Sequence, residues 1–315
     1  MQIAPGPVAL DRFRAALQKL HVADSDRLLC AISGGPDSMA LLLLAQQTMP
    51  DRLVAATVDH QLRRESSDEA NYVHSVCQKL GIPHVTLTPD EAISGNIQSS
   101  ARTARYMLLE RTADAQNCTH IATAHHADDQ LETILMRLAR GSGVDGLSSI
   151  RAQNGRVIRP LLQFRKAELV SLCADAGIVP VNDPSNGNAD FARVAMRNWL
   201  ESTDHPFRAD RAARTTEALA AASEALVWMT DWLASQRIRL ENEILICDAS
   251  KIPDELKRRL LMRCLSTVDP DITPRGDAID RLLDDLEKGR MATIGDVKCV
   301  GGAQWRFSPA PPRRS

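Results

Sequence analysis

Short apolar segments alternate with amphipathic ones over the first two hundred residues. The apolar runs at residues 27–32, 53–59, 84–87 and 120–124 have the length and composition of buried strands. The segments 37–47, 67–80, 98–114 and 128–140 have helical spacing, and Gly81 and Gly141 stand where two of these helices should end. Strands that alternate with helices at these intervals predict a doubly wound α/β fold, in which helices cover both faces of a parallel sheet.

The pattern changes near residue 200. Apolar residues at positions 219, 222, 226, 229 and 233 recur every three or four residues and predict one amphipathic helix. Two more helices are predicted around 256–265 and 279–286, and the glycine pair at 301–302 predicts a terminal hairpin. We therefore expect a larger domain at residues 1–204 and a smaller α-rich domain at 205–315, with the boundary within 201–208.

The composition excludes several classes of protein. Apolar residues make up 44% of the 315 residues, which is enough for packed cores. The 38 Lys and Arg residues against 40 Asp and Glu exclude a uniformly basic coat for nucleic acid, although local basic patches remain compatible. The longest apolar run, at 39–45, is far shorter than the about 20 residues of a membrane span, so we expect no membrane partner and a cytoplasmic location.

Seven cysteines are dispersed along the chain, and no two of them form a CxxC pair. Zinc and iron–sulfur sites generally need such paired thiolates. We therefore expect reduced, buried cysteines.

The strongest local motif follows the first predicted strand. Its residues, which lead directly into a predicted helix, are Ser33, Gly34, Gly35, Pro36, Asp37 and Ser38. The two glycines allow the backbone to approach a phosphate chain, and the N–H groups at a helix start attract anions. The hydroxyls of Ser33 and Ser38 would add donors, whereas the Asp37 carboxylate would act on phosphate through Mg²⁺. The motif is neither a Walker A loop nor GxGxxG, and an ordinary Gly-Pro turn with a helix cap is the alternative interpretation.

A second group of candidate residues follows the strand at 120–124. Asp128, Asp129 and Glu132 are spaced to share one face of the next helix, and His125 precedes that helix. Several carboxylates at the end of a strand could hold a metal ion or an ammonium group. A solvated acidic first turn is the alternative, because Asp and Glu favour that position in any helix.

Basic residues indicate where phosphates could bind. Gln98, Arg102 and Arg105 fall on one helix face, where the guanidinium groups could neutralise phosphate or could simply face the solvent. Two basic stretches, at 151–166 and 257–263, could follow an RNA backbone or could be solvated helix faces.

Other polar and aromatic residues are less informative. Asp59, at a strand end, could contact a ribose or cap the strand. Trp199, Trp228 and Trp232 are as compatible with a core position as with base stacking.

Together, these motifs resemble the tRNA(Ile)-lysidine synthase family of the PP-loop ATP pyrophosphatase superfamily. The resemblance covers roughly residues 28–200. It rests above all on the segments SGGPDS at 33–38, HHADDQLET at 125–133, RGSGVDGL at 140–147 and DPSN at 183–186. It implies a PP-loop fold like that of adenine nucleotide α-hydrolases, ATP as co-substrate and Mg²⁺ as cofactor.

The resemblance also implies roles for individual residues. The loop 33–38 would bind ATP, and Asp37 and Asp129 would hold Mg²⁺. The catalytic residues would be Asp37, Arg105, His125, Asp129, Glu132 and Arg197. Ala195 stands where the family often has a basic residue, which weakens the assignment of neighbouring Arg193 but leaves that of Arg197 in place.

The reaction implied by the resemblance modifies the CAU anticodon of an isoleucine tRNA, which the smaller domain would help to bind. The C2 oxygen of the wobble cytidine would attack the α-phosphate of ATP, and pyrophosphate would leave. The ε-amine of free L-lysine would then displace AMP from C2, which requires a neutral amine and a proton acceptor. The candidates for that acceptor are His125, Asp129 and Glu132.

Three rival interpretations remain. A PP-loop tRNA thiolase is disfavoured by the missing CxxC pair, and an amidating synthetase by the lack of a glutaminase signature. A nucleotide- and RNA-binding module without catalysis would not need the acidic residues. The sequence leaves the oligomeric state open, with a homodimer as one option.

Overall fold

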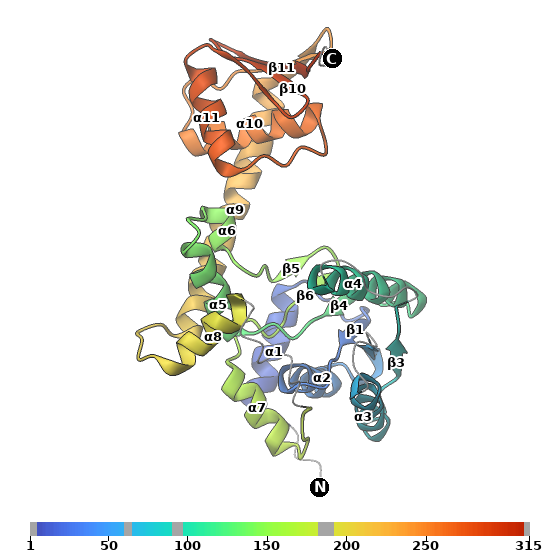
Figure 1. Cartoon of the computed structure of the whole chain (residues 1–315). Helices are drawn as coiled ribbons and strands as arrows, with labels where there is room; N and C mark the ends of the chain where they lie inside the picture. Colours follow the sequence, from blue (N-terminus) through green and yellow to red (C-terminus); the bar gives the residue numbers. More distant parts are fainter. Residues whose placement is uncertain (1–4, 60–64, 90–96, 182–191, 312–315) are drawn as a thin grey trace. The chain divides into compact units, whose positions relative to one another are not determined.

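The computed structural model describes residues 5–59, 65–89, 97–181 and 192–311 (Figure 1). The chain divides into two compact units, Met1–Ala220 and Ala221–Ser315, and this division lies inside the long helix α9 (Ala209–Arg237). Among the helices of the described ranges, none is both long and apolar enough to cross a membrane.

The first unit contains a six-stranded sheet in the order β3-β2-β1-β4-β6-β5. Its strands are β1 (Leu28–Ala31), β2 (Leu53–Val58), β3 (His84–Leu87), β4 (His120–Ala122), β5 (Gln153–Asn154) and β6 (Val157–Ile158). All described pairs are parallel except β5 with β6. In the centre of the sheet, Leu28 of β1 is in register with Leu53 of β2 and His120 of β4. The predicted parallel sheet is confirmed.

Helices cover both faces of this sheet, as the doubly wound fold predicts (Figure 1). The described helices before α9 are α1 (Pro7–Lys19), α2 (Pro36–Thr48), α3 (Glu65–Leu80), α4 (Ile97–Ala115), α5 (Ala127–Leu138), α6 (Val144–Leu147), α7 (Lys166–Asp175) and α8 (Ala192–Ser202), with a 3₁₀ turn at Pro50–Arg52. Of these, α2 and α3 pack on one face of the sheet and α4 on the other. Alternate residues of β1 point to opposite faces. Leu28 and Cys30 join the core beneath α1, α2, α3 and α7, whereas Leu29 joins a separate core beneath α4.

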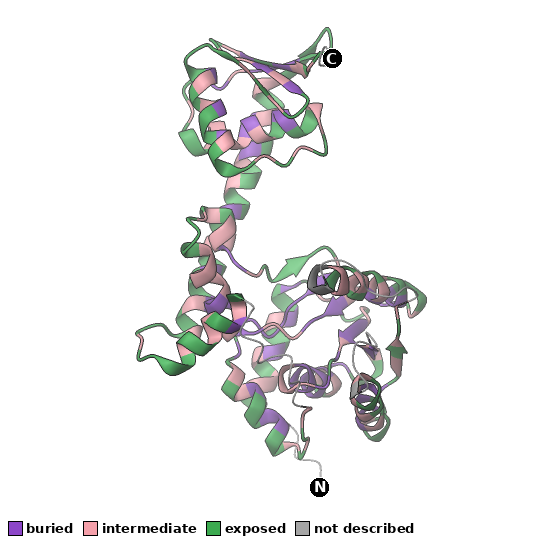
Figure 2. Ribbon diagram, in the orientation of Figure 1, coloured by how far each residue is buried: buried purple, intermediate pink, exposed green. Residues whose placement is uncertain are grey.

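Helix α2 is the most deeply buried helix of this unit. Its residues Met39 to Ala45 are all buried, so the helix has no polar face along that length (Figure 2). A helix that is apolar all round must be surrounded by other elements. Because α2 begins directly after the SGGPDS loop, this packing holds the loop rigidly at the carboxyl end of β1.

The described part of the second unit contains the C-terminal part of α9, two further helices and a second sheet. The helices are α10 (Asp254–Val268) and α11 (Gly276–Glu287). The strands are β7 (Ile238–Glu241), β8 (Ile244–Cys247), β9 (Met291–Ile294), β10 (Val297–Val300) and β11 (Trp305–Pro309). They form an antiparallel sheet in the order β7-β8-β11-β10-β9. Leu260, Leu286 and Phe307 are fully buried in its core.

The glycine pair at 301–302 predicts the hairpin of β10 and β11 but not the five-stranded sheet of which it is part, so the term "α-rich" is incomplete. One cause is the turn between β7 and β8. Asn242 and Glu243 form a two-residue connection and have φ values of 47° and 64°. Such turns are usually recognised by a glycine, which is absent here. The domain boundary at residues 204–205 stays a prediction.

Candidate active site

The SGGPDS loop is held in shape by its own serines. Ser38 Oγ accepts a hydrogen bond from the Ser33 backbone N–H at 3.1 Å and donates one to the Gly35 carbonyl at 3.0 Å. Gly34 has a φ of +87°, which favours glycine, and a Cβ there would lie 3.3 Å from Val181. Ser38 is buried and occupied with loop structure, whereas the exposed Ser33 side chain is accessible to a ligand.

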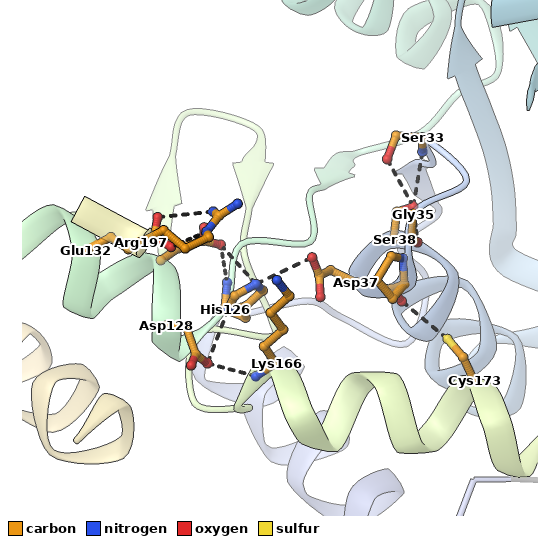
Figure 3. Close-up of polar contacts among 12 residues, drawn as sticks. Ser33, Gly35, Asp37, Ser38, His126, Asp128, Glu132, Lys166, Cys173 and Arg197 are labelled. Atoms are coloured by element: carbon orange, nitrogen blue, oxygen red, sulfur yellow. Dashed lines mark hydrogen bonds and ion pairs between the residues drawn. The ribbon is translucent and has the colours of Figure 1, made fainter. Parts of the chain in front are cut away.

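The loops that follow β1 and β4 meet at one edge of the sheet. The two strands are neighbours, but the chain leaves β1 toward β2 on the opposite side, and open α/β sheets generally bind ligands in the crevice at such a point. Asp37 comes from the first turn of α2, which follows β1. His126, at the N-terminus of α5, comes from the loop after β4 (Figure 3).

The His126 ring lies among three carboxylates. Its Nε2 atom is 3.4 Å from Asp37 Oδ2 and 3.6 Å from Asp129 Oδ2, and its Nδ1 atom is 3.6 Å from Asp128 Oδ2 (Figure 3). Burial by itself would lower the pKa of His126, but the close Asp128 and Asp37 carboxylates and the charge of Asp129 outweigh it and raise the pKa to about 10. His126 is therefore an imidazolium at neutral pH.

The carboxylates respond in the opposite direction. Burial opposes ionisation of Asp128 and Asp129, yet the charge of His126 and backbone hydrogen bonds hold the pKa of both below the ordinary value. One of these bonds runs from the His126 backbone N–H to Asp129 Oδ2 at 2.9 Å and caps α5. These residues thus form a buried ionic cluster rather than a solvated acidic turn.

The neighbouring His125 has the opposite protonation state. Burial, together with the positive charges of Arg159, Arg193 and Arg102, lowers its pKa to about 4 although Asp129 acts to raise it. Its Nδ1 atom lies 3.0 Å from Thr123 Oγ1, which leaves Nε2 for another partner. Adjacent groups whose pKa values are pushed apart in this way are typical of acid–base sites.

Two arginines of α8 bind the acidic residues of α5. Arg197 donates from Nε to Glu132 Oε1 at 2.7 Å and from Nη2 to Oε2 at 3.2 Å (Figure 3). Arg193 donates from Nε to Glu132 Oε2 at 2.8 Å and from Nη2 to Asp129 Oδ1 at 2.9 Å. Glu132 is only 3% exposed, and both of its oxygens are occupied by guanidinium groups.

The structure brings Arg193 into the same cluster as Arg197, although Ala195 weakened its assignment from the sequence. The i,i+4 spacing of Arg193 and Arg197, which puts both on one helix face, was the available signal. His126 was also missed as a candidate, although it stands beside His125 in the same motif.

Other candidate residues lie farther from this cluster or outside the described residues. Arg105 is exposed on α4, next to Tyr106, whose ring lies 5.0 Å from the Arg102 guanidinium. Asp59 is buried, and Ser67 Oγ donates to it at 3.0 Å. The Gln98 side chain and the DPSN segment at 183–186 fall outside the described residues.

The three tryptophans left open by the sequence are at the surface of the structure. Trp199, Trp228 and Trp232 are 43%, 66% and 52% exposed, so none of them is a core residue. The seven cysteines are free and buried, as expected.

The residues expected to hold Mg²⁺, Asp37 and Asp129, both lie next to the Nε2 atom of His126. Asp37 Oδ1 is buried and, in the described structure, has no hydrogen-bond partner. No group of three or more His, Cys, Asp or Glu among the described residues is arranged to hold a metal. Mg²⁺ commonly uses one or two carboxylates and completes its shell with phosphates and water. Asp37 and Asp129 therefore fit a Mg²⁺ ion that binds together with a nucleotide.

Comparison with known proteins identifies the family of this chain. Residues 9–203 match the PP-loop domain family. The chain is 40% identical over 305 residues to the tRNA(Ile)-lysidine synthase of Zymomonas mobilis, covering 92% of this chain and 90% of that protein. It is 42% identical over 320 residues to the tRNA(Ile)-lysidine synthase of Novosphingobium aromaticivorans, covering 98% and 95%.

A solved structure shares the fold. The U34-tRNA thiolase NcsA from Methanococcus maripaludis with its [4Fe-4S] cluster superposes with a TM-score of 0.55 at 18% identity, covering 67% of this chain and 77% of that one. This similarity concerns the fold alone. The match to the PP-loop domain and the identities over nearly the whole chain show that this protein belongs to the tRNA(Ile)-lysidine synthase family.

Proposed function

We propose that this protein joins free L-lysine to C2 of the wobble cytidine in the CAU anticodon of isoleucine tRNA, in the cytoplasm, with conversion of ATP to AMP and pyrophosphate. The observation that carries the proposal is the meeting of the SGGPDS loop with a buried ionic cluster at one edge of the sheet. The contact between Asp37 and His126, at 3.4 Å, joins the two parts.

In the first step, the C2 oxygen of cytidine attacks the α-phosphate and pyrophosphate leaves. The N–H groups at the start of α2 orient the phosphate chain, because the first turn of a helix has donors without helical acceptors. A Mg²⁺ ion held by Asp37 and Asp129 would neutralise phosphate charge when bound. Arg193 and Arg197, fixed by Glu132, provide preorganised positive charge at the same edge.

In the second step, the lysine ε-amine attacks C2 and AMP leaves. The amine must lose a proton, since its ordinary pKa lies near 10.4. Asp129 is the carboxylate that we assign to orient the ammonium group, because an arginine binds only its Oδ1 atom, whereas arginines bind both oxygens of Glu132. The neutral His125 is the proton acceptor, and the negative phosphates of the intermediate would raise its pKa toward neutrality.

The rival functions lack support in the structure. A thiolase needs reactive thiolates, whereas all seven cysteines are buried, and burial raises the pKa of Cys77 and Cys173 to about 12. A module that only binds nucleotide and RNA would have no use for two adjacent histidines in opposite protonation states.

Incorporation of radiolabelled lysine into a CAU isoleucine tRNA transcript tests the proposal. We expect stable label that depends on both ATP and lysine, with one AMP released per lysine incorporated. A transcript with U in place of the wobble C is the matched control and should stay unlabelled. If ATP is bound but no lysine is incorporated into the CAU transcript, the proposal is wrong and a binding module is favoured.

A further inference from the structure

The first turn of α7 contacts the ionic cluster at Asp128, a residue that has no role in the two proposed steps. The backbone N–H of Lys166, the first residue of α7, donates to Asp128 Oδ2 at 2.7 Å. The same oxygen lies 3.6 Å from His126 Nδ1. Lys166 and His126 therefore share one carboxylate, which fixes the Lys166 backbone beside the crevice.

The rest of α7 is anchored against the phosphate loop. Cys173 Sγ donates to the carbonyl of Pro36, the first residue of α2, at 3.3 Å. Leu169, between these two contacts, is fully buried in the core that α7 shares with α2. The position of Lys166 relative to the loop is thus set by three separate contacts along α7.

The Lys166 side chain extends from this anchor toward His126 and Asp37 (Figure 3). Within the described part of the chain, no carboxylate lies within ion-pair distance of its ammonium group. The carboxylates around it already have cations: His126 contacts Asp37 and Asp128, and Arg193 binds Asp129. The half-buried ammonium group is therefore available for an anion that enters the crevice.

We propose that Lys166 binds the phosphate chain of the nucleotide on the pyrophosphate side and holds the leaving pyrophosphate. This inference rests on the proposed use of ATP. The arginines of α8 bind acidic residues of α5 and leave Asp37 uncontacted, whereas the Lys166 side chain extends from Asp128 toward Asp37, in the first turn after the phosphate loop (Figure 3). A lysine ammonium group is a common phosphate ligand, and a charge-assisted hydrogen bond becomes stronger as the leaving oxygen gains charge.

The variant Lys166→Met removes the charge and keeps most of the side-chain volume. We expect the Kd of ATP and the Kd of inorganic pyrophosphate, both measured by calorimetry with Mg²⁺ and without tRNA or lysine, to rise about tenfold to a hundredfold. Lys166→Arg should stay within about threefold of the natural protein. Arg165→Met removes an exposed charge one residue away, whose side chain faces Glu168 at 3.6 Å, and should change neither constant by more than about twofold.

Three outcomes overturn the inference: unchanged ATP and pyrophosphate binding in Lys166→Met, an equal loss in Arg165→Met, or a selective rise in the KM of tRNA or of lysine. Thermal unfolding of each variant separates a loss of fold from a loss of binding, and Lys166→Arg should recover the affinity. Because these binding measurements need neither tRNA nor lysine, they can succeed even if lysine incorporation fails. If the binding constants change as expected but no lysine is incorporated, the proposed function is wrong, whereas the assignment of Lys166 to a polyphosphate site stands.

Discussion

His126 Nε2 lies 3.4 Å from Asp37 Oδ2, although the two residues are 89 positions apart in the chain. The contact exists because β1 and β4 are neighbours in the sheet, so the loop after each strand reaches the same crevice. It joins the phosphate loop to the residues that we assign to lysine activation.

The loss of Asp37 should stop the first half-reaction. Asp37→Ala removes a carboxylate that contacts His126 and is assigned to Mg²⁺, so we expect pyrophosphate release to fall by about a hundredfold or more. The fold should remain intact, because Asp37 is partly exposed and lies at a helix start. Pyrophosphate release and circular dichroism measured on the same preparation check both parts. Release at the natural rate would contradict the loop assignment.

The replacement of Glu132 should affect lysine transfer more than adenylation. Glu132→Gln removes the charge that anchors Arg193, and Arg193 also binds Asp129, the carboxylate that we assign to orient lysine. The first step keeps the SGGPDS loop and Asp37, so its loss should be smaller. We also expect a loss of about 1–3 kcal/mol in the free energy of unfolding, because charged hydrogen bonds to a buried carboxylate are lost. Single-turnover assays of each half-reaction test the first point. Equal losses in both would mean that the role of Glu132 is misassigned.

Glu110→Gln is the matched stability control for that experiment. Glu110 makes an ion pair with Arg156 at 3.4 Å. The Glu110 side chain is 41% exposed and that of Arg156 is 34% exposed. Partly exposed pairs of this kind contribute little to stability. The free energy of unfolding of Glu110→Gln should therefore differ from that of the natural protein by less than about 1 kcal/mol.

Arg193 should not be replaceable by lysine. Its guanidinium group bridges two carboxylates, with Nε on Glu132 and Nη2 on Asp129, and a single ammonium group cannot reproduce that fork. We expect Arg193→Lys and Arg193→Ala to reduce kcat for lysine incorporation by similar factors, about tenfold or more. Full activity of Arg193→Lys would show that only the positive charge matters.

The first unit should lose stability in mild acid through His84. Burial, together with the nearby His74, lowers the pKa of His84 to about 4 in the folded protein. The unfolded chain, with an ordinary histidine pKa near 6.5, binds the proton more readily, so stability falls as the pH drops from about 6.5 to 4. The upper limit of this contribution is about 3 kcal/mol.

Chemical denaturation between pH 4.5 and 7.5 measures this effect. His84→Gln can keep a hydrogen bond to Thr57 Oγ1, which lies 2.9 Å from His84 Nε2, while it removes the titration. The variant should therefore show a shallower pH dependence, whereas His21→Asn, at an exposed histidine, should follow the natural protein. An identical slope in His84→Gln would refute the assignment.

The sequence was sufficient for the features that depend on local pattern. Alternating apolar runs and helical spacing predicted the parallel sheet, and the SGGPDS and HHADDQLET motifs located the phosphate loop and the acidic helix. In the second unit, local patterns also predicted the helices α10 and α11, but they found only one hairpin of the five-stranded sheet. The turn at Asn242 and Glu243 carries no glycine, and three of the four residues of β7 are exposed, so no alternation marks that strand.

The tertiary structure decided which of these residues act together. Arg193 reaches Glu132 across 61 positions and Asp129 across 64, and Lys166 reaches Asp128 across 38. No periodicity in the chain encodes such contacts, because they depend on strand order and on how helices pack over the sheet. The protonation states of His125 and His126 were decided in the same way, since burial and the charges of neighbouring side chains, rather than residue type, separate the pKa values of two adjacent histidines.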